Sequence, residues 1–121
     1  MPKPKTYNIT FVQGDTYNLR LRFKDANSDP VDITGWEFKA QVRANYDAEL
    51  ALAEFTYVID DQVTNTGYVD LTLSDIQTTP LPVAVMPDPS GYWDLEITYP
   101  SGDVLTVMAG KVTVKAQVTR G

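Results

Sequence analysis

The stretch Tyr17-Asn-Leu-Arg-Leu-Arg-Phe-Lys24 shows most clearly how this chain folds, because its side chains alternate in character. Residues 17, 19, 21 and 23 are apolar or aromatic, and the residues between them are polar or cationic. Successive side chains of a β-strand point to opposite faces of the sheet, so a period of two predicts a strand with one buried face. A helix would spread the same residues around its circumference.

The same alternation recurs along the whole chain, in residues 9–11, 36–43, 53–59, 69–73, 93–99 and 112–118. Residues that favour turns separate these segments, as in Asp25-Ala-Asn-Ser-Asp-Pro30, Thr34-Gly35, Asn65-Thr-Gly67, Ser90-Gly91 and Pro100-Ser-Gly-Asp103. About seven short strands, each with one polar face, predict an all-β antiparallel sandwich or barrel.

Two segments depart from this pattern. Residues 45–52 are interpreted as one helical turn or a bulged connection. Ser74 is a predicted N-cap of a short helix that ends before Pro80, and residues 80–89 are expected to form an irregular crossing loop. Residues 1–6 are interpreted as an extended N-terminal arm without partners in the domain, and residues 7–121 as a single β-sandwich domain.

Composition excludes several kinds of chemistry within this chain. Its 121 residues include no cysteine and no histidine. A disulfide framework, a thiolate zinc site and a Ser-His-Asp triad therefore cannot form within it. The net charge of −6 argues against binding to a nucleic-acid backbone. No apolar run approaches the ~20 residues of a membrane span. We expect no catalytic residue, no metal, no cofactor, and neither nucleic acid nor membrane as a partner.

Two groups of acidic residues are candidate sites. Asp25, Asn27 and Asp29 have the spacing that opens an EF-hand calcium loop, but Pro30 stands where that loop needs glycine. A turn in which the side chains bond the local backbone is the favoured interpretation. Asp60 and Asp61 are adjacent carboxylates, and glycoside hydrolases use a pair of carboxylates. Neighbours on a strand point to opposite faces, so we expect solvated turn residues instead.

A possible interaction surface comes from cationic and aromatic residues in the outward register. If the strands holding Arg20 and Arg22 and those holding Lys39 and Arg43 were neighbours, a cationic sheet face would result. The favoured alternative is a solvated face on which these cations pair across strands with Glu37, Glu54 and Glu96. Tyr68 and Tyr92 also fall in the outward register, where an exposed aromatic ring can serve an interface or a sugar.

Five short motifs carry a resemblance to a known family. They are Gln13-Gly-Asp-Thr16, Asp29-Pro-Val-Asp-Ile-Thr-Gly35, Gln41-Val-Arg43, Gly91-Tyr-Trp-Asp-Leu-Glu-Ile97 and Gly110-Lys-Val-Thr-Val114. Together they resemble the immunoglobulin-like domains of tailed-phage structural proteins, such as the N-terminal domain of baseplate upper proteins. Ser28 departs from that pattern, since the family's turn usually carries glycine there. The resemblance covers most of the chain.

The resemblance implies a non-enzymatic structural protein of a tailed-phage virion, in a tail, baseplate, neck or head decoration. It implies docking onto other virion structural proteins, assembly as a homo-oligomer or in a symmetric particle, and a virion location after assembly in the host cytoplasm. Exposed strand edges are the expected docking surface, because they present unpaired N–H and C=O groups. The alternative function is a glycan-binding module for host attachment, with its site near Tyr68 or Tyr92.

Overall fold

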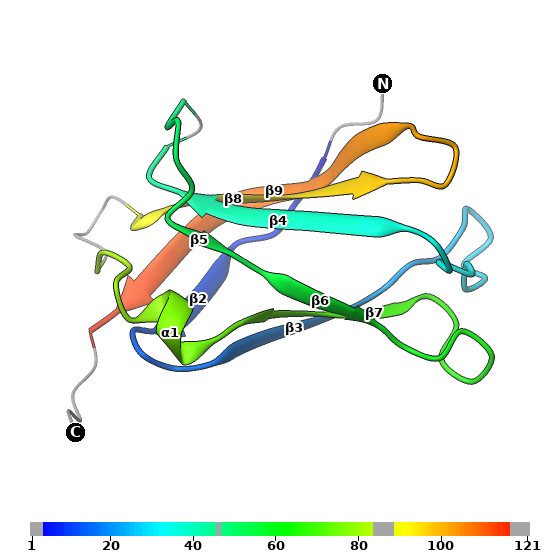
Figure 1. Ribbon diagram of the computed structural model, residues 1–121, viewed down its shortest axis with the longest axis horizontal. Helices are drawn as coiled ribbons and strands as arrows, with labels where there is room; N and C mark the ends of the chain where they lie inside the picture. Colours follow the sequence, from blue (N-terminus) through cyan, green and yellow to red (C-terminus); the bar gives the residue numbers. More distant parts are fainter. Residues whose placement is uncertain (1–3, 46, 84–88, 117–121) are drawn as a thin grey trace.

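The computed structural model describes residues 4–45, 47–83 and 89–116, and these form two β-sheets packed face to face (Figure 1). Sheet A has the order β1-β9-β8-β4-β5, with β2 also paired to β9, and sheet B has the order β3-β7-β6. The elements are β1 (Lys5–Thr6), β2 (Ile9–Val12), β3 (Tyr17–Arg22), β4 (Glu37–Arg43), β5 (Ala53–Glu54), β6 (Thr56–Ile59), β7 (Tyr68–Leu73), α1 (Asp75–Thr78), β8 (Gly91–Thr98) and β9 (Val104–Lys115). The predicted all-β sandwich with one short helix is confirmed.

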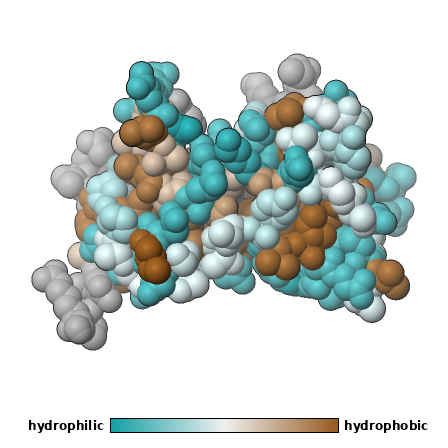
Figure 2. All heavy atoms as spheres, viewed as in Figure 1, coloured by the Kyte–Doolittle hydropathy of each residue, from teal (hydrophilic) through white to brown (hydrophobic). Residues whose placement is uncertain are grey.

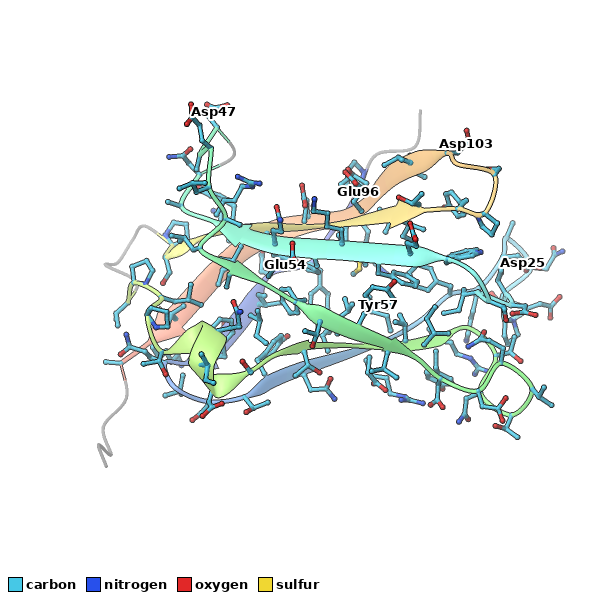
Figure 3. All side chains as sticks on the ribbon, in the orientation of Figure 1. Asp25, Asp47, Glu54, Tyr57, Glu96 and Asp103 are labelled. Atoms are coloured by element: carbon cyan, nitrogen blue, oxygen red, sulfur yellow. The ribbon has the colours of Figure 1, made fainter. Side chains whose placement is uncertain are left out.

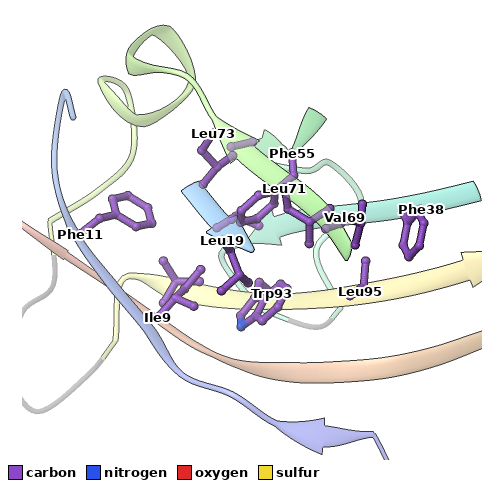
Figure 4. Packing of buried hydrophobic residues seen from close by; sticks show 14 of the residues in the cluster. Ile9, Phe11, Leu19, Phe38, Phe55, Val69, Leu71, Leu73, Trp93 and Leu95 are labelled. Atoms are coloured by element: carbon purple, nitrogen blue, oxygen red, sulfur yellow. The ribbon is translucent and has the colours of Figure 1, made fainter. Parts of the chain in front are cut away.

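The core lies between the sheets and is made by the inward residues of the alternating segments (Figure 4). In β8, Trp93, Leu95 and Ile97 are fully buried, whereas the residues between them are partly exposed. Leu19 on β3 and Leu71 on β7 approach them from sheet B. Apolar burial of this kind is the main stabilising contribution to a sandwich, and the period of two decides which residues supply it.

The chain crosses from sheet A to sheet B at Phe55. The sequence predicts one strand over residues 53–59, but β5 pairs with β4 of sheet A and β6 pairs with β7 of sheet B. Phe55 lies at the crossing, where its N–H donates to the Ala40 carbonyl oxygen (2.9 Å) and its ring is buried. The alternation of side chains continues through the crossing, so the pattern alone cannot reveal it.

The last strand is longer than predicted. The alternation indicates a strand that starts at Val112, whereas β9 begins at Val104, and its residues 104–112 pair with β8. The register shifts between Leu95 and Glu96, where Val107 is the extra residue on the β9 side. Such a bulge interrupts the period of two, which is why residues 104–111 were missed. Residues 117 and 118 of the predicted strand lie outside the described residues.

The N-terminal segment is part of sheet A. Lys5 and Thr6 pair with Met108 and Ala109 of β9, and β2 continues the same edge. The prediction that residues up to Thr6 lack partners in the domain is therefore wrong, and so is a purely antiparallel sandwich, because β1 and β2 run parallel to β9. The two prolines near the N-terminus favour an extended arm locally, whereas the pairings that hold it span about a hundred residues of sequence.

Glycine at position 110 permits this close approach of the N-terminal strand. A Cβ atom at Gly110 would clash with the carbonyl group of Tyr7. The same Tyr7 carbonyl oxygen accepts a 2.7 Å hydrogen bond from the indole N–H of Trp93, and the Asn8 side chain accepts one from the Lys111 N–H. The link between β1 and β2 is thus bonded to the two long strands of sheet A.

The predicted helix is confirmed, and Ser74 caps it. The Ser74 hydroxyl oxygen accepts a hydrogen bond from the Gln77 N–H, as an N-cap residue does. In the 45–52 segment the described residues form turns and bends, not a helix. Tyr46 lies outside the described residues, as do residues 84–88 of the predicted crossing loop.

Candidate interaction surfaces

The outer face of sheet B carries Arg20, Arg22 and Tyr68, three of the predicted site residues. Arg20 donates to Asp60 and Asp70 carboxylate oxygens, each at 2.7 Å. Arg22 donates to the Thr66 carbonyl oxygen at 3.2 Å. Both guanidinium groups also lie over the Tyr68 ring, 4.3 Å and 4.7 Å from its centre. Tyr68 is thus covered by arginines.

The ion pairs of Arg20 perturb the titration of their members. Hydrogen bonds to Asp60 and then Asp70 raise the pKa of Arg20 above its usual value. The hydrogen bond from Arg20, followed by that from the Asp61 N–H, lowers the pKa of Asp60. Both shifts favour the charged forms, so this face is an internally neutralised network at neutral pH.

The outer face of sheet A carries the other predicted residues, Lys39, Arg43 and Tyr92, on β4 and β8. Arg43 donates to the Ala48 carbonyl oxygen (2.7 Å) and to the Gln41 side chain (2.8 Å). A hollow of about 220 Å³ opens on this face, lined by Lys39, Gln41, Arg43, Asp94 and Glu96. A smaller hollow beside it is lined by Tyr92 and Trp93 together with Gln41, Arg43 and Asp94.

Asp94 lies in both hollows, and its carboxyl group is in an unfavourable position for a charge. Burial raises the pKa of Asp94, the nearby Glu96 carboxylate raises it further, and Arg43 partly opposes both effects. The smaller hollow therefore combines the Asp94 carboxyl group, whose pKa is raised, with Arg43 and Tyr92.

The continuous cationic face, which was not the favoured interpretation, does not form. It required the strands of Arg20 and Lys39 to be neighbours, but β3 belongs to sheet B and β4 to sheet A. The two pairs of cations consequently lie on opposite outer faces of the sandwich. Part of the alternative holds, because Lys39 lies directly across from Glu96 in the β4–β8 register.

The two acidic motifs form turns. The Asp25 carboxylate accepts hydrogen bonds from the N–H groups of Asn27 and Asp29, which confirms the turn interpretation of this segment. Ser28 in the same turn has a φ of +67°, the left-handed conformation that glycine adopts at least cost. Asp60 binds Arg20, whereas Asp61 accepts from Val63 N–H and the Thr64 hydroxyl, so the two carboxylates do not converge.

A cleft that the sequence pattern does not indicate lies on the side of the sandwich where β4 faces β6. On the edge of β4 that faces away from β8, residues 37–39 have no partner strand among the described residues, because the chain leaves for sheet B at Phe55. The opening is about 570 Å³. We call it the acidic cleft; its lining residues are Glu37, Phe38, Lys39, Glu54, Phe55, Thr56, Tyr57, Glu96 and Thr98.

The acidic cleft has an aromatic floor and a charged rim. The Tyr57 and Phe38 rings meet edge to face, 5.3 Å apart, and Tyr57 is 38% exposed. Figure 3 shows Glu54, Tyr57 and Glu96 around β4 on this side of the molecule. Figure 2, which looks at the same side, shows hydrophilic residues across its middle and hydrophobic areas toward both ends. Among the described residues, Arg20 is the only cation that forms ion pairs, and its partners are Asp60 and Asp70. The carboxylates at the rim of the cleft therefore have no ion pair in the described structure.

A second opening lies on the opposite side, where β1 and β9 of sheet A face β3 of sheet B. It measures about 340 Å³. We call it the basic groove; it is lined by Lys5, Leu21, Arg22, Phe23, Lys24, Val107 and Met108. Its charged residues are all cationic, and the others are apolar.

Both openings depend on which strands lie at the sheet edges. From the sequence, the carboxylates of the acidic cleft are expected only as cross-strand partners of the cations. A charge pattern along single strands cannot show that Glu37 and Glu54 meet at one edge, since that edge exists only after the chain crosses sheets.

No group of histidine, cysteine, aspartate or glutamate side chains suited to holding a metal ion occurs in residues 4–45, 47–83 and 89–116. In the same ranges, no helix has the length and apolar character needed to cross a membrane. No protein-family model matches the chain, and no curated protein matches it in sequence.

Proposed function

We propose that this protein is a non-enzymatic structural component of a tailed-phage virion that docks onto other virion proteins. The observation that carries this proposal is that, among the residues the structure describes, strand edges without a partner strand lie beside both the acidic cleft and the basic groove. Strand edges beside charged openings are suited to binding other proteins, because main-chain groups supply affinity and side chains supply selectivity.

The motif resemblance supports the virion setting of this proposal. Its segments lie on the strands and turns that build the sandwich, as in Gly91–Thr98 of β8. The positive φ of Ser28 also agrees with a turn at which the family usually carries glycine. An immunoglobulin-like relationship, a virion location and a role in tail, baseplate, neck or head decoration all belong to this proposal.

Virion incorporation tests the proposal. Phage particles produced by the source cells are purified on a density gradient, and their proteins are identified and quantified by mass spectrometry. We expect peptides of this chain in the particle fraction at a fixed ratio to a tail or head protein. Peptides found only in the soluble fraction, with none in intact or partly assembled particles, would contradict the proposal.

A second candidate function is a glycan-binding module for host attachment. The hollows on the outer face of sheet A favour that face as its binding site. Tyr92 there adjoins Gln41, Arg43 and Asp94, which combine an aromatic ring with polar donors and acceptors. Tyr68 suits a sugar less well, because two guanidinium groups cover its ring. A glycan array would identify a ligand whose binding is lost in Tyr92→Ala and kept in Tyr68→Ala. If the array gives no binding signal, this candidate is excluded.

A further inference from the structure

The acidic cleft and the basic groove lie on opposite sides of the same sandwich. The cleft borders β4, β5 and β6, which end one side of sheets A and B. The groove borders β1, β9 and β3, which end the other side. Each opening therefore lies where an edge of sheet A faces an edge of sheet B.

The two openings have complementary charge. The rim of the cleft has the carboxylates of Glu37, Glu54 and Glu96 against one ammonium group, that of Lys39. The described residues that line the groove include the cations Lys5, Arg22 and Lys24 and no carboxylate, and the Arg22 guanidinium also contacts the Tyr68 ring. Glu37, Glu54, Lys5 and Lys24 are all exposed, so these charges are available to a partner. Opposite surface charges of this kind steer association and set the register of a contact.

The edge strands also run in compatible directions. In sheet B, β3 and β6 are both antiparallel to β7, so they point the same way. In sheet A, β1 is parallel to β9 and β4 has the direction of β9, since β8 is antiparallel to both. A second copy placed beside the first in the same orientation thus presents the β3 edge to β6, and the β1 and β9 edge to β4.

We propose that copies of this chain associate head to tail, with the basic groove of one copy against the acidic cleft of the next. The partner in this contact is thus a second copy of the chain. The inference rests on the assembly function proposed above. A two-fold dimer through either opening alone would place like charges together. Contact between two different patches is heterologous, so it builds a ring if the rotation closes and a filament if it does not.

The Tyr57 ring adds an apolar contribution on the cleft side. It lies on β6, lines the opening and has 38% of its surface exposed. On the groove side, Leu21, Phe23, Val107 and Met108 are partly buried and border the opening. Apolar contact between these edges would stabilise an association that the charges orient.

Sedimentation velocity over a wide concentration range tests the proposal with a charge-swap pair. The cleft variant is Glu37→Lys with Glu54→Lys, and the groove variant is Lys5→Glu with Lys24→Glu. We expect the mass of the unaltered chain to rise with concentration. Each variant alone should lose about tenfold or more in association constant, because like charges then meet. An equimolar mixture of the two variants should regain association, because the altered cleft then matches the altered groove.

Matched controls place the same charge changes away from both openings. Glu49→Lys with Asp103→Lys parallels the cleft variant, and Lys111→Glu with Lys115→Glu parallels the groove variant; all four positions are exposed, and none of them lines either opening. The controls should associate as the unaltered chain does, and circular dichroism verifies that every variant is folded.

Three outcomes overturn the inference: a monomer at all concentrations, association insensitive to the variants, or a mixture that fails to regain it. A monomeric chain that is nevertheless found in purified particles refutes self-association and leaves the proposed virion function standing, with another virion protein as the partner. Self-association without any virion incorporation would support the head-to-tail contact and refute the proposed virion function.

Discussion

The outer faces of the two sheets contain the same kinds of residue, arginine, tyrosine and aspartate, but their charges are arranged differently. On sheet B, Arg20 lies opposite Asp70 in the strand register and also reaches Asp60, and the Tyr68 ring lies beneath two guanidinium groups. On sheet A, the Asp94 carboxyl group lies in a hollow, where burial and Glu96 raise its pKa.

The difference follows from what the register places opposite each charge. Asp70 faces Arg20 directly, whereas Asp94 faces the neutral Gln41. A carboxylate with a cation opposite it is stabilised in its charged form, and one without is penalised by desolvation. The sheet B face is thus a network of paired charges, whereas on the sheet A face the Asp94 carboxyl group has no cation directly opposite it.

The largest expected effect comes from removing the ring that organises the sheet B face. Tyr68→Ala removes a partly buried ring and both cation–π contacts. We expect a loss of about 2 kcal/mol in the free energy of unfolding, measured by urea denaturation. Tyr68→Phe keeps the ring and should retain nearly the full stability. An equal loss in both variants would show that the hydroxyl group, and not the ring, is important.

A smaller effect is expected from Asp60→Asn, and it should depend on pH. Because the fold lowers the pKa of Asp60, its charge stabilises the protein above the ordinary carboxyl pKa of 3.8, and this contribution is lost as the pH falls through the folded pKa. The variant should therefore have a lower Tm than the unaltered chain at neutral pH, with the gap closing in acid. Asp29→Asn is an exposed control without an ion pair in the described structure. A gap that stays constant with pH would refute the ion-pair explanation.

The smallest effect, of opposite sign, is expected on sheet A. Because the fold raises the pKa of Asp94, stability is lost as the pH rises from the ordinary value of 3.8 through the folded pKa. Asp94→Asn removes that penalty, so its Tm should exceed that of the unaltered chain at neutral pH and match it in acid. Asp103→Asn, in an exposed turn, should show no such gain. Destabilisation of Asp94→Asn at neutral pH would mean that its attraction to Arg43 outweighs its burial.

Much of the fold was predictable because it depends on local alternation. The residues that fill the core, such as Leu19, Leu71 and Trp93, follow from the period of two alone. The helix after Ser74 was predictable for a similar reason, since an N-cap acts within one turn. The candidate residues on outer faces were also correctly placed outside the core, because outward register is a local property.

The arrangement of those faces was not predictable from the pattern. Arg20 and Lys39 have the same outward register, but only strand pairing shows that they lie on different sheets. Asp60 was interpreted as a solvated turn residue, because nothing near it in sequence indicates that Arg20, forty residues away, would bind it.

By itself the sequence determined an all-β chain, its inward residues and most of its turns, because side-chain alternation and turn chemistry act between near neighbours. Only the tertiary structure decided that the chain changes sheets at Phe55, that β1 joins β9, and that carboxylates and cations gather at opposite open sides. These features depend on pairing between distant segments, and a single strand's pattern is compatible with more than one partner.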